Sequence, residues 1–190
     1  MHRIVIFASG SGTNAENIIR HFQNSTLARV NWVLCNNKDA GVLNRAASLG
    51  VPTRVFSKKE LFSRDFIDFV GNEADLVVLA GFLLKIPEKL TRSFPKTMIN
   101  IHPALLPKYG GKGMYGMNVH RAVVSNEEKE SGITIHYVNE NYDEGAIIFQ
   151  KKVALDANDT ADDVAEKIHL LEQENFPLVI EKLLRSRDEG

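Results

Sequence analysis

The stretch Met98-Ile99-Asn100-Ile101-His102-Pro103-Ala104-Leu105-Leu106-Pro107 places two polar side chains inside an apolar run. Asn100 and His102 stand at alternate positions, so in a strand both side chains leave the same face. The apolar neighbours predict a buried strand, and a buried amide beside a buried imidazole needs hydrogen-bond partners or a chemical role. Two interpretations stay open here: a polar strand end, or part of a reactive site.

Strand-like apolar runs and helical patterns alternate along the chain up to this stretch. The third run begins with Val51-Pro52, and a proline near its start favours an edge position. Strands that alternate with helices indicate a parallel sheet with helices on both faces, in which ligands bind at the carboxyl ends of the strands. The predicted strands are 4–8, 30–35, 51–56, 76–80 and 98–102, with helices carrying Ile18, Ile19 and Phe22, then 43–49, and 59–70 ended by Gly71.

The pattern changes after Pro107. A glycine-rich segment, 109–116, precedes a predicted helix over 118–124 and two strands, 133–138 and 146–155, that are close enough for a hairpin-like pair. Thr160 to Asp163 has the form of a capping box for a last helix, which Pro177 kinks or restarts.

The predicted architecture is an α/β fold with a mostly parallel twisted sheet of about seven strands, helices on both faces and a Rossmann-like N-terminal half. We expect one domain over 1–190, with an N-terminal half over about 1–97 and a C-terminal half over about 98–190.

Composition excludes several functional classes. The net charge of −1 gives no overall attraction to nucleic acid or membranes, so an anionic ligand must be bound by a local arrangement. A single cysteine, Cys35, excludes an internal disulfide framework, and no run is long and apolar enough for a membrane span. No histidine pair has the HExxH spacing, so metal chemistry is not expected. These features predict a cytoplasmic protein.

The turn Ser9-Gly10-Ser11-Gly12-Thr13-Asn14 lies between the first strand and the first helix. Its glycines let the backbone approach a phosphate at a helix N-terminus, and its hydroxyl and amide groups suit direct contact with a single phosphate. A nicotinamide enzyme would also need an acid after the second strand, where this chain has Cys35-Asn36-Asn37. A merely tight strand-to-helix turn is the alternative.

Two acids are further candidates. Asp143 lies in the loop between the last two strands, and a carboxylate near a histidine raises the pKa of the imidazole and orients the ring. Asp143 is equally an ordinary turn residue before a glycine. Glu172 lies beside the apolar stripe of the last helix, where its carboxylate either holds sugar hydroxyls or turns to solvent.

Four segments stand in the order and spacing of the folate-dependent formyltransferases, which the chain resembles over essentially its whole length. They are Ser9–Asn14, Leu79–Phe82, Asn100–Pro107 and the Asp143 loop. The Asn-x-His-Pro-x-Leu-Leu-Pro element is typical of the superfamily, and the glycine turn indicates its glycinamide ribonucleotide branch. We expect neither the C-terminal RNA-binding domain of the methionyl-tRNA branch nor the N-terminal regulatory domain of the formyltetrahydrofolate deformylases.

The resemblance implies transfer of a formyl group from 10-formyltetrahydrofolate to the amine of glycinamide ribonucleotide, a step of purine biosynthesis that needs no metal. It implies that Asn100 and protonated His102 stabilise the oxyanion, while Asp143 keeps His102 charged and assists proton transfer. The implied phosphate and ribose site comprises Gly12, Thr13, Asn14 and Glu172. The implied folate pocket comprises Arg64, Leu83, Leu84, Lys85, Ile86, Asn139, Glu140, Asn141 and Tyr142.

The chain departs from the family pattern in two places. Asn118-Val119-His120 follows a longer glycine-rich loop where relatives have a His-x-His pair, and Leu84-Lys85 stands where an arginine is expected. The alternatives are another folate-dependent formyltransferase, a formyl-folate hydrolase, a Rossmann-type oxidoreductase, and a nucleotide or folate sensor without catalysis. The expected partners are the two small-molecule substrates, with no nucleic acid or membrane, in a monomer or homodimer.

Overall fold

The computed structural model describes residues 1–189, and a seven-stranded sheet runs through its centre. The strand order is β3-β2-β1-β4-β5-β6-β7. β1 to β5 pair in parallel, whereas β6 is antiparallel to β5 and to β7. The strands are β1 (His2–Ala8), β2 (Ala28–Cys35), β3 (Thr53–Val55), β4 (Leu76–Leu79), β5 (Met98–His102), β6 (Glu130–Tyr137) and β7 (Ile147–Ala154). The predicted fold class, the edge position of the third strand and the hairpin-like last pair are confirmed.

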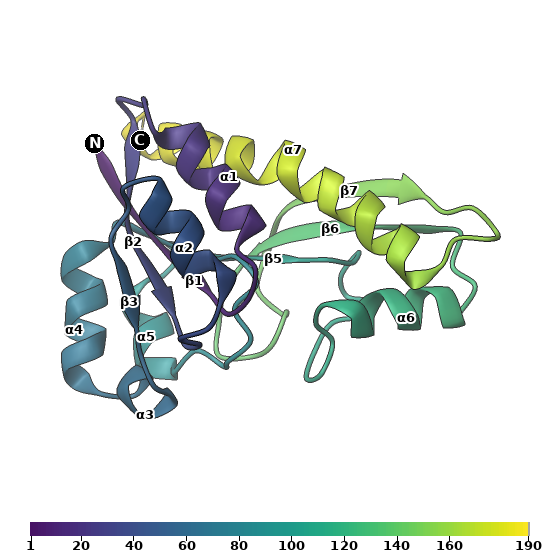
Figure 1. Ribbon diagram of the computed structural model, residues 1–190, viewed down its shortest axis with the longest axis horizontal. Coiled ribbons are helices and arrows are strands. Elements are labelled where there is room, and N and C mark those ends of the chain that lie inside the picture. The colour runs from purple at the N-terminus through teal and green to yellow at the C-terminus, as the bar shows by residue number, and fades with distance from the viewer. Residues whose placement is uncertain (190) are drawn as a thin grey trace.

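Helices cover both faces of the sheet and bury a separate hydrophobic cluster on each (Figure 1). One face packs against α1, α2, α6 and α7, and the other against α3, α4 and α5. Each cluster follows from the apolar stripes of its helices, which remove those side chains from water. The helices are α1 (Thr13–Phe22), α2 (Gly41–Ser48), α3 (Lys58–Leu61), α4 (Arg64–Glu73), α5 (Glu88–Ser93), α6 (Met117–Ser125) and α7 (Ala161–Asp188).

The prediction of one continuous helix over 59–70 is wrong. The segment forms two helices, α3 and α4, because the hydroxyl of Ser63 accepts the backbone N–H of Phe66 and starts a new helix there. Gly71 does not end α4, which continues to Glu73. An internal capping residue therefore decided the break, whereas the glycine was tolerated inside the helix.

Pro177 does not restart the last helix, since α7 runs without interruption from Ala161 to Asp188. A proline inside a helix leaves the carbonyl four residues earlier without its usual N–H donor. Here that carbonyl belongs to Gln173, and the side-chain amide of Asn17 on α1 donates to it at 2.7 Å. A tertiary hydrogen bond thus replaces the missing helical one, and it ties α7 to α1.

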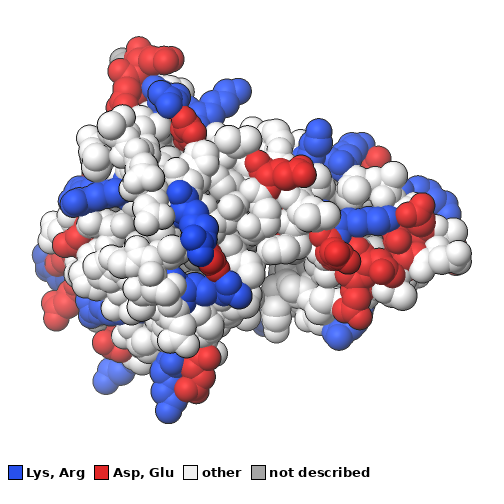
Figure 2. Space-filling model, turned by 45° about the horizontal axis from the view of Figure 1, so that its top comes forward, with Lys and Arg blue, Asp and Glu red and all other residues white. Residues whose placement is uncertain are grey.

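Charged side chains of both signs are interspersed over the face drawn in Figure 2, in keeping with the net charge of −1. No single-signed surface therefore stands out on this face. Among the described residues, 1–189, no helix combines the length and apolar character that a membrane crossing requires.

Candidate active site

A cavity of about 730 Å³ opens where β1, β4 and β5 end, at the edge of the sheet where ligands bind in open α/β folds. Its walls come from segments that are far apart in the sequence. They are Gly10–Asn14, 79–86, 100–103, 111–116, His120, His136, 138–143 and the α7 residues Ala165, Ile168, His169 and Glu172. The structure thus brings together every predicted site residue except Arg64.

His102 lies buried at the end of β5 with both ring nitrogens near an acceptor. Nε2 is 2.7 Å from the carbonyl oxygen of Tyr109, so Nε2 carries a proton and donates it. Nδ1 lies 3.6 Å from Oδ2 of Asp143, which also accepts the backbone N–H of Gly111 at 2.9 Å. A second proton on Nδ1 would therefore face a carboxylate, as the predicted His102 and Asp143 pair requires.

Asn100 is held by a second buried histidine, His136, which lies directly opposite it across the antiparallel β5–β6 pair. Nδ1 of His136 lies 2.9 Å from the carbonyl oxygen of Tyr137, so the proton sits on Nδ1 and Nε2 is free to accept. Nδ2 of Asn100 donates to that Nε2 at 3.1 Å. The amide keeps a second N–H, which is free to donate to a ligand.

Burial is the largest influence on the pKa of His102 in the free protein. Desolvation lowers the pKa of His102 below its ordinary value, and the nearby Asp143 carboxylate only partly opposes this shift. The role of Asp143 in keeping His102 charged during the reaction stays a prediction, and in the free protein burial acts against it. Burial also acts to raise the pKa of Asp143, but the electrostatic influence of the neighbouring His136 and His102 rings and the Gly111 N–H together hold that pKa below its usual range.

The glycine-rich segment is fastened at its start to both members of the pair. The carbonyl of Tyr109 accepts from His102, and the N–H of Gly111 donates to Asp143. Since the Nε2–H of His102 is donated to Tyr109 and Nδ1 faces the Asp143 carboxylate, a bound ligand can receive a hydrogen bond from this ring only if one of the two contacts is released. We expect the Tyr109 contact to give way, because the neutral carbonyl is the weaker partner for a protonated ring.

Hydrogen exchange is expected to show this change over Tyr109–Met117. Four glycines in the segment leave the free chain little conformational preference, so ordering it costs entropy that bound ligands must offset. Protection of these amides should rise when both substrates are present, as a lid over the transfer site would require. The ribonucleotide alone serves as the control, and identical protection in the free and doubly liganded protein would contradict the prediction.

The glycine turn leaves the N-terminus of α1 uncapped and open to the cavity. Gly12 is the N-cap residue with φ of +81°, and no side chain bonds to the first turn of the helix. The free N–H groups and the positive end of the helix dipole together form an anion site. Ser9 does not contribute, because its hydroxyl donates to Asn36 at 2.6 Å and accepts the N–H of Leu83 at 3.0 Å.

Asn14 links this turn to α7. Its Nδ2 donates to Oε2 of Glu172 at 2.8 Å, and its Oδ1 accepts Nε2 of Gln173 at 2.9 Å. The Glu172 carboxylate therefore leans into the cavity instead of turning to solvent, with Nδ1 of His169 at 3.6 Å from it. That carboxylate raises the pKa of His169 by hydrogen bonding. An acid is thus held beside the anion site, where a ribose attached to a bound phosphate would lie.

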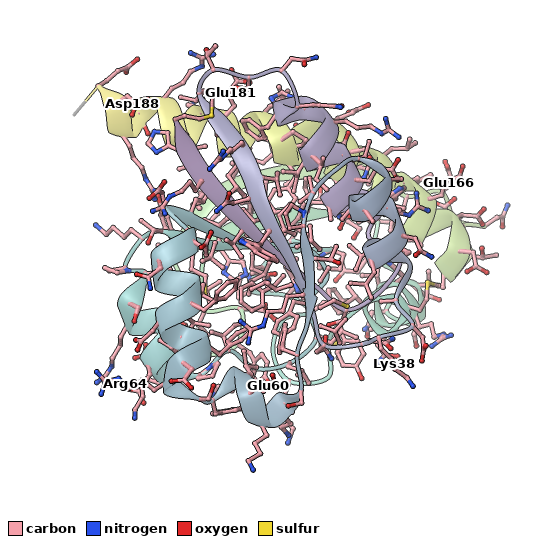
Figure 3. The ribbon with its side chains drawn as sticks, turned by 60° about the vertical axis from the view of Figure 1, so that its left-hand side comes forward. Lys38, Glu60, Arg64, Glu166, Glu181 and Asp188 are labelled. Carbon is pink, nitrogen blue, oxygen red and sulfur yellow. The ribbon has the colours of Figure 1, made fainter. Side chains whose placement is uncertain are left out.

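The opposite wall of the cavity is more apolar. Leu83–Ile86 follow β4, Asn139–Tyr142 follow β6, and Nζ of Lys85 lies 5.5 Å from the ring centre of Tyr142. Arg64 is not part of this wall. Arg64 lies at the start of α4, its side chain is 91% exposed, and its Nε is 3.5 Å from Oδ2 of Asp68. The side chain points away from the body of the protein (Figure 3). Its predicted place in the folate pocket is therefore wrong for this arrangement.

Comparison with known proteins identifies the family of this chain. A sequence model of the formyl transferase family matches residues 2–180. The chain belongs to the formyl transferase family. A relative in Bacillus subtilis (strain 168), a phosphoribosylglycinamide formyltransferase, is 33% identical over all of this chain and 98% of its own length. The crystal structure of phosphoribosylglycinamide formyltransferase from Anaplasma phagocytophilum matches 97% of this chain and 88% of its own, with a TM-score of 0.88 and 32% identity.

Plant relatives of this formyl transferase family member are longer. The chloroplastic phosphoribosylglycinamide formyltransferase of Arabidopsis thaliana is 38% identical over 99% of this chain, which spans 68% of the relative. The chain spans 62% of the Vigna unguiculata enzyme at 39% identity. The resemblance to the formyltransferases inferred from four sequence segments is thereby confirmed.

Sequence reasoning missed two polar residues that support this formyltransferase site: His136, which lines the cavity, and Thr134, which lies behind it. They alternate on the buried strand β6, which is the same signal that singled out Asn100 and His102 on β5. Thr134 accepts the N–H of Leu106 at 3.0 Å and donates to the carbonyl of Ala104 at 2.6 Å. It thereby fixes the turn that follows His102. A search for polar residues at alternate positions of every apolar strand would have found both.

Proposed function

We propose that this protein transfers the formyl group of 10-formyltetrahydrofolate to the amine of glycinamide ribonucleotide. One observation carries the proposal: Asn100, His102 and Asp143 meet in one cavity between an uncapped helix N-terminus and an apolar wall. The helix end and Glu172 suit a phosphate and a ribose, whereas the wall formed by Leu83–Ile86 suits a pterin. Both halves of the chain are needed, since Glu172 and Leu83–Ile86 lie on opposite sides of the expected boundary near residue 97.

In the proposed reaction, the amine nitrogen attacks the formyl carbon and negative charge develops on the formyl oxygen. The free N–H of Asn100 and the protonated ring of His102 donate to that oxygen, an effect of roughly 3 kcal/mol for one well-placed donor. The C–N bond to N10 of the folate then breaks. The proton lost by the amine passes to N10 with the help of the Asp143 carboxylate. The products are the N-formyl ribonucleotide and tetrahydrofolate.

A formyl-transfer assay with 10-formyl-5,8-dideazafolate and glycinamide ribonucleotide tests the proposal. We expect dideazafolate and the formylated ribonucleotide to appear in equal amounts, and no turnover without the ribonucleotide. Release of formate in the absence of the ribonucleotide would show a hydrolase instead. If neither the formylated ribonucleotide nor formate is produced, the protein has the fold without the reaction.

In the same assay, Asn14→Ala is expected to raise the KM for glycinamide ribonucleotide about tenfold or more, with little change in the KM for the folate. The substitution removes the hydrogen bond that holds Glu172 beside the anion site, and a buried carboxylate without its donor is costly. Asn24→Ala, an exposed asparagine beyond the end of α1, is the matched control. Equal effects on both substrates would contradict the placement of the ribonucleotide at this end of the cavity.

A further inference from the structure

His120 is a buried titratable residue that the proposed reaction does not use. It lies on α6, its side chain is 5% exposed, and its ring forms part of the cavity wall. Its Nδ1 is sealed from solvent and has no hydrogen-bond partner among the described residues. A buried polar atom without a partner is uncommon in folded proteins, and on a cavity wall it indicates that the rest of the group serves a ligand.

The environment of Nδ1 fixes where the proton of His120 lies. A proton on Nδ1 would be a buried donor with no acceptor, which is more costly than a buried lone pair. The neutral ring therefore carries its proton on Nε2. Burial lowers the pKa of His120, and the Glu172 carboxylate only partly opposes this shift, so the surroundings favour the neutral ring.

Nε2 of His120 is available to a ligand. Nε2 forms no hydrogen bond with the described residues. Unlike Nδ1, it is not a buried atom that is closed off from solvent. Since the ring borders the cavity, the Nε2–H group opens onto the space where a substrate binds. His120 is thus a neutral, preorganised donor with no protein acceptor.

The position of His120 indicates which part of a substrate it meets. The charges of Glu172 and His102 both act on its ring, so it lies within electrostatic reach of the acid and of the catalytic imidazole. Glu172 lies at the expected ribose, and His102 lies at the expected transfer point. The part of glycinamide ribonucleotide between these two points is the glycinamide link, whose carbonyl oxygen is a hydrogen-bond acceptor.

We propose that His120 is a substrate-binding residue, whose Nε2–H donates a hydrogen bond to the amide carbonyl oxygen of glycinamide ribonucleotide. This inference rests on the proposed function. The contact holds the link between the ribose and the amine, and so it sets the position of the attacking amine relative to His102 and Asn100. His120 is therefore a positioning residue for the reaction, in addition to the predicted ribonucleotide contacts.

Calorimetric titration of glycinamide ribonucleotide into the protein without folate tests this contact. His120→Leu fills the same space without a donor, and we expect it to raise the Kd about ten- to fiftyfold, because a hydrogen bond is lost and the substrate carbonyl is left unpaired. His120→Gln restores an N–H donor and should stay within about threefold of the wild type. The KM for 10-formyldideazafolate should be unchanged in both variants. His21→Leu, on the far part of α1, is the matched control.

The outcomes separate this inference from the proposed function. If the wild-type protein neither binds nor formylates the ribonucleotide, the proposed function fails. Two results with an active wild type would contradict the hydrogen bond: a normal Kd for the ribonucleotide in His120→Leu, or a Kd in His120→Gln as high as in His120→Leu. His120 would then only line the cavity. If His120→Leu does not fold, spectra of the wild type with ¹⁵N-labelled histidine decide: the ribonucleotide must move the Nε2 signal of His120, and an unchanged signal overturns the contact.

Discussion

Asp143→Asn is expected to lower kcat for formyl transfer by about a hundredfold or more, the scale of losing acid-base assistance. The carboxylate lies 3.6 Å from Nδ1 of His102 and is the charged group nearest to that nitrogen in the cavity. An amide of the same shape keeps the packing and removes the charge. His102→Ala should cost a similar amount, and the double variant little more, because residues that act as one unit are not additive.

The pH profile distinguishes a charge effect from a structural one. The pKa of His102 is already lowered by burial, and the Asp143 carboxylate is the largest influence that raises it. Without that carboxylate the pKa falls further, so the protonated form is lost at lower pH. If protonated His102 is the reactive form, activity declines as pH rises through this pKa, and Asp143→Asn moves the decline to lower pH.

An NMR titration of His102 in the wild type and in Asp143→Asn measures this shift directly. Asp68→Asn is the matched control, because Asp68 is exposed and pairs with Arg64 away from the cavity. A His102 pKa that is the same in Asp143→Asn and the wild type would show that the two side chains are not coupled. Asp143, which adopts a φ of +56°, would then be a turn residue only.

Gly145→Ala is expected to destabilise the fold by about 3 kcal/mol or more, through overpacking at a site with no room to relax. A Cβ atom on Gly145 would overlap with the carbonyl oxygen of Tyr137, a backbone atom. The same carbonyl accepts the Nδ1–H of His136, which orients the ring that holds Asn100. Stability and activity should therefore fall together.

Thermal unfolding measures the first effect, with an expected decrease in Tm of roughly 6–12 °C for a protein of this size. Gly71→Ala is the matched control, because Gly71 lies inside α4 and a Cβ there meets no atom within 4 Å. That substitution should leave Tm unchanged or raise it slightly, since alanine is the better helix former. A Gly145→Ala protein as stable as the wild type would contradict the close approach of Gly145 to the end of β6.

The fold could be predicted from the sequence because its signals are local and periodic. The alternation of strands and helices gave the sheet, and Thr160 and Asp163 form the capping box that the sequence indicated. The errors arose where a distant contact overrides the local signal. Nothing near Pro177 in the sequence shows that Asn17 will replace its missing hydrogen bond, and a residue-by-residue transfer placed Arg64 in a pocket that it does not reach.

The sequence predicted which residues form the candidate site better than it predicted their pKa values. Asn100 and His102 stand out because polar residues alternate on an apolar strand, and the structure places them with Asp143 in one cavity. The sequence indicates both the burial of His102, which lowers its pKa, and the neighbouring acid, which raises it, but it does not show that burial is the larger influence. The hydrogen bond from His102 to Tyr109 uses a backbone carbonyl as its acceptor, which no side-chain pattern can indicate. The catalytic and binding roles of these residues remain predictions.

The hydrogen bond between Asn14 and Glu172 joins residues that are 158 positions apart, and this separation has a consequence for synthesis on the ribosome. The glycine turn emerges from the ribosome long before the acid beside it, which arrives with α7. Domains generally fold as units during translation, so the anion site gains its carboxylate only when α7 docks on α1. A chain that stops before α7 would carry the early turn without the acid, and complete ribonucleotide binding is therefore expected only after α7 has been synthesised and has docked.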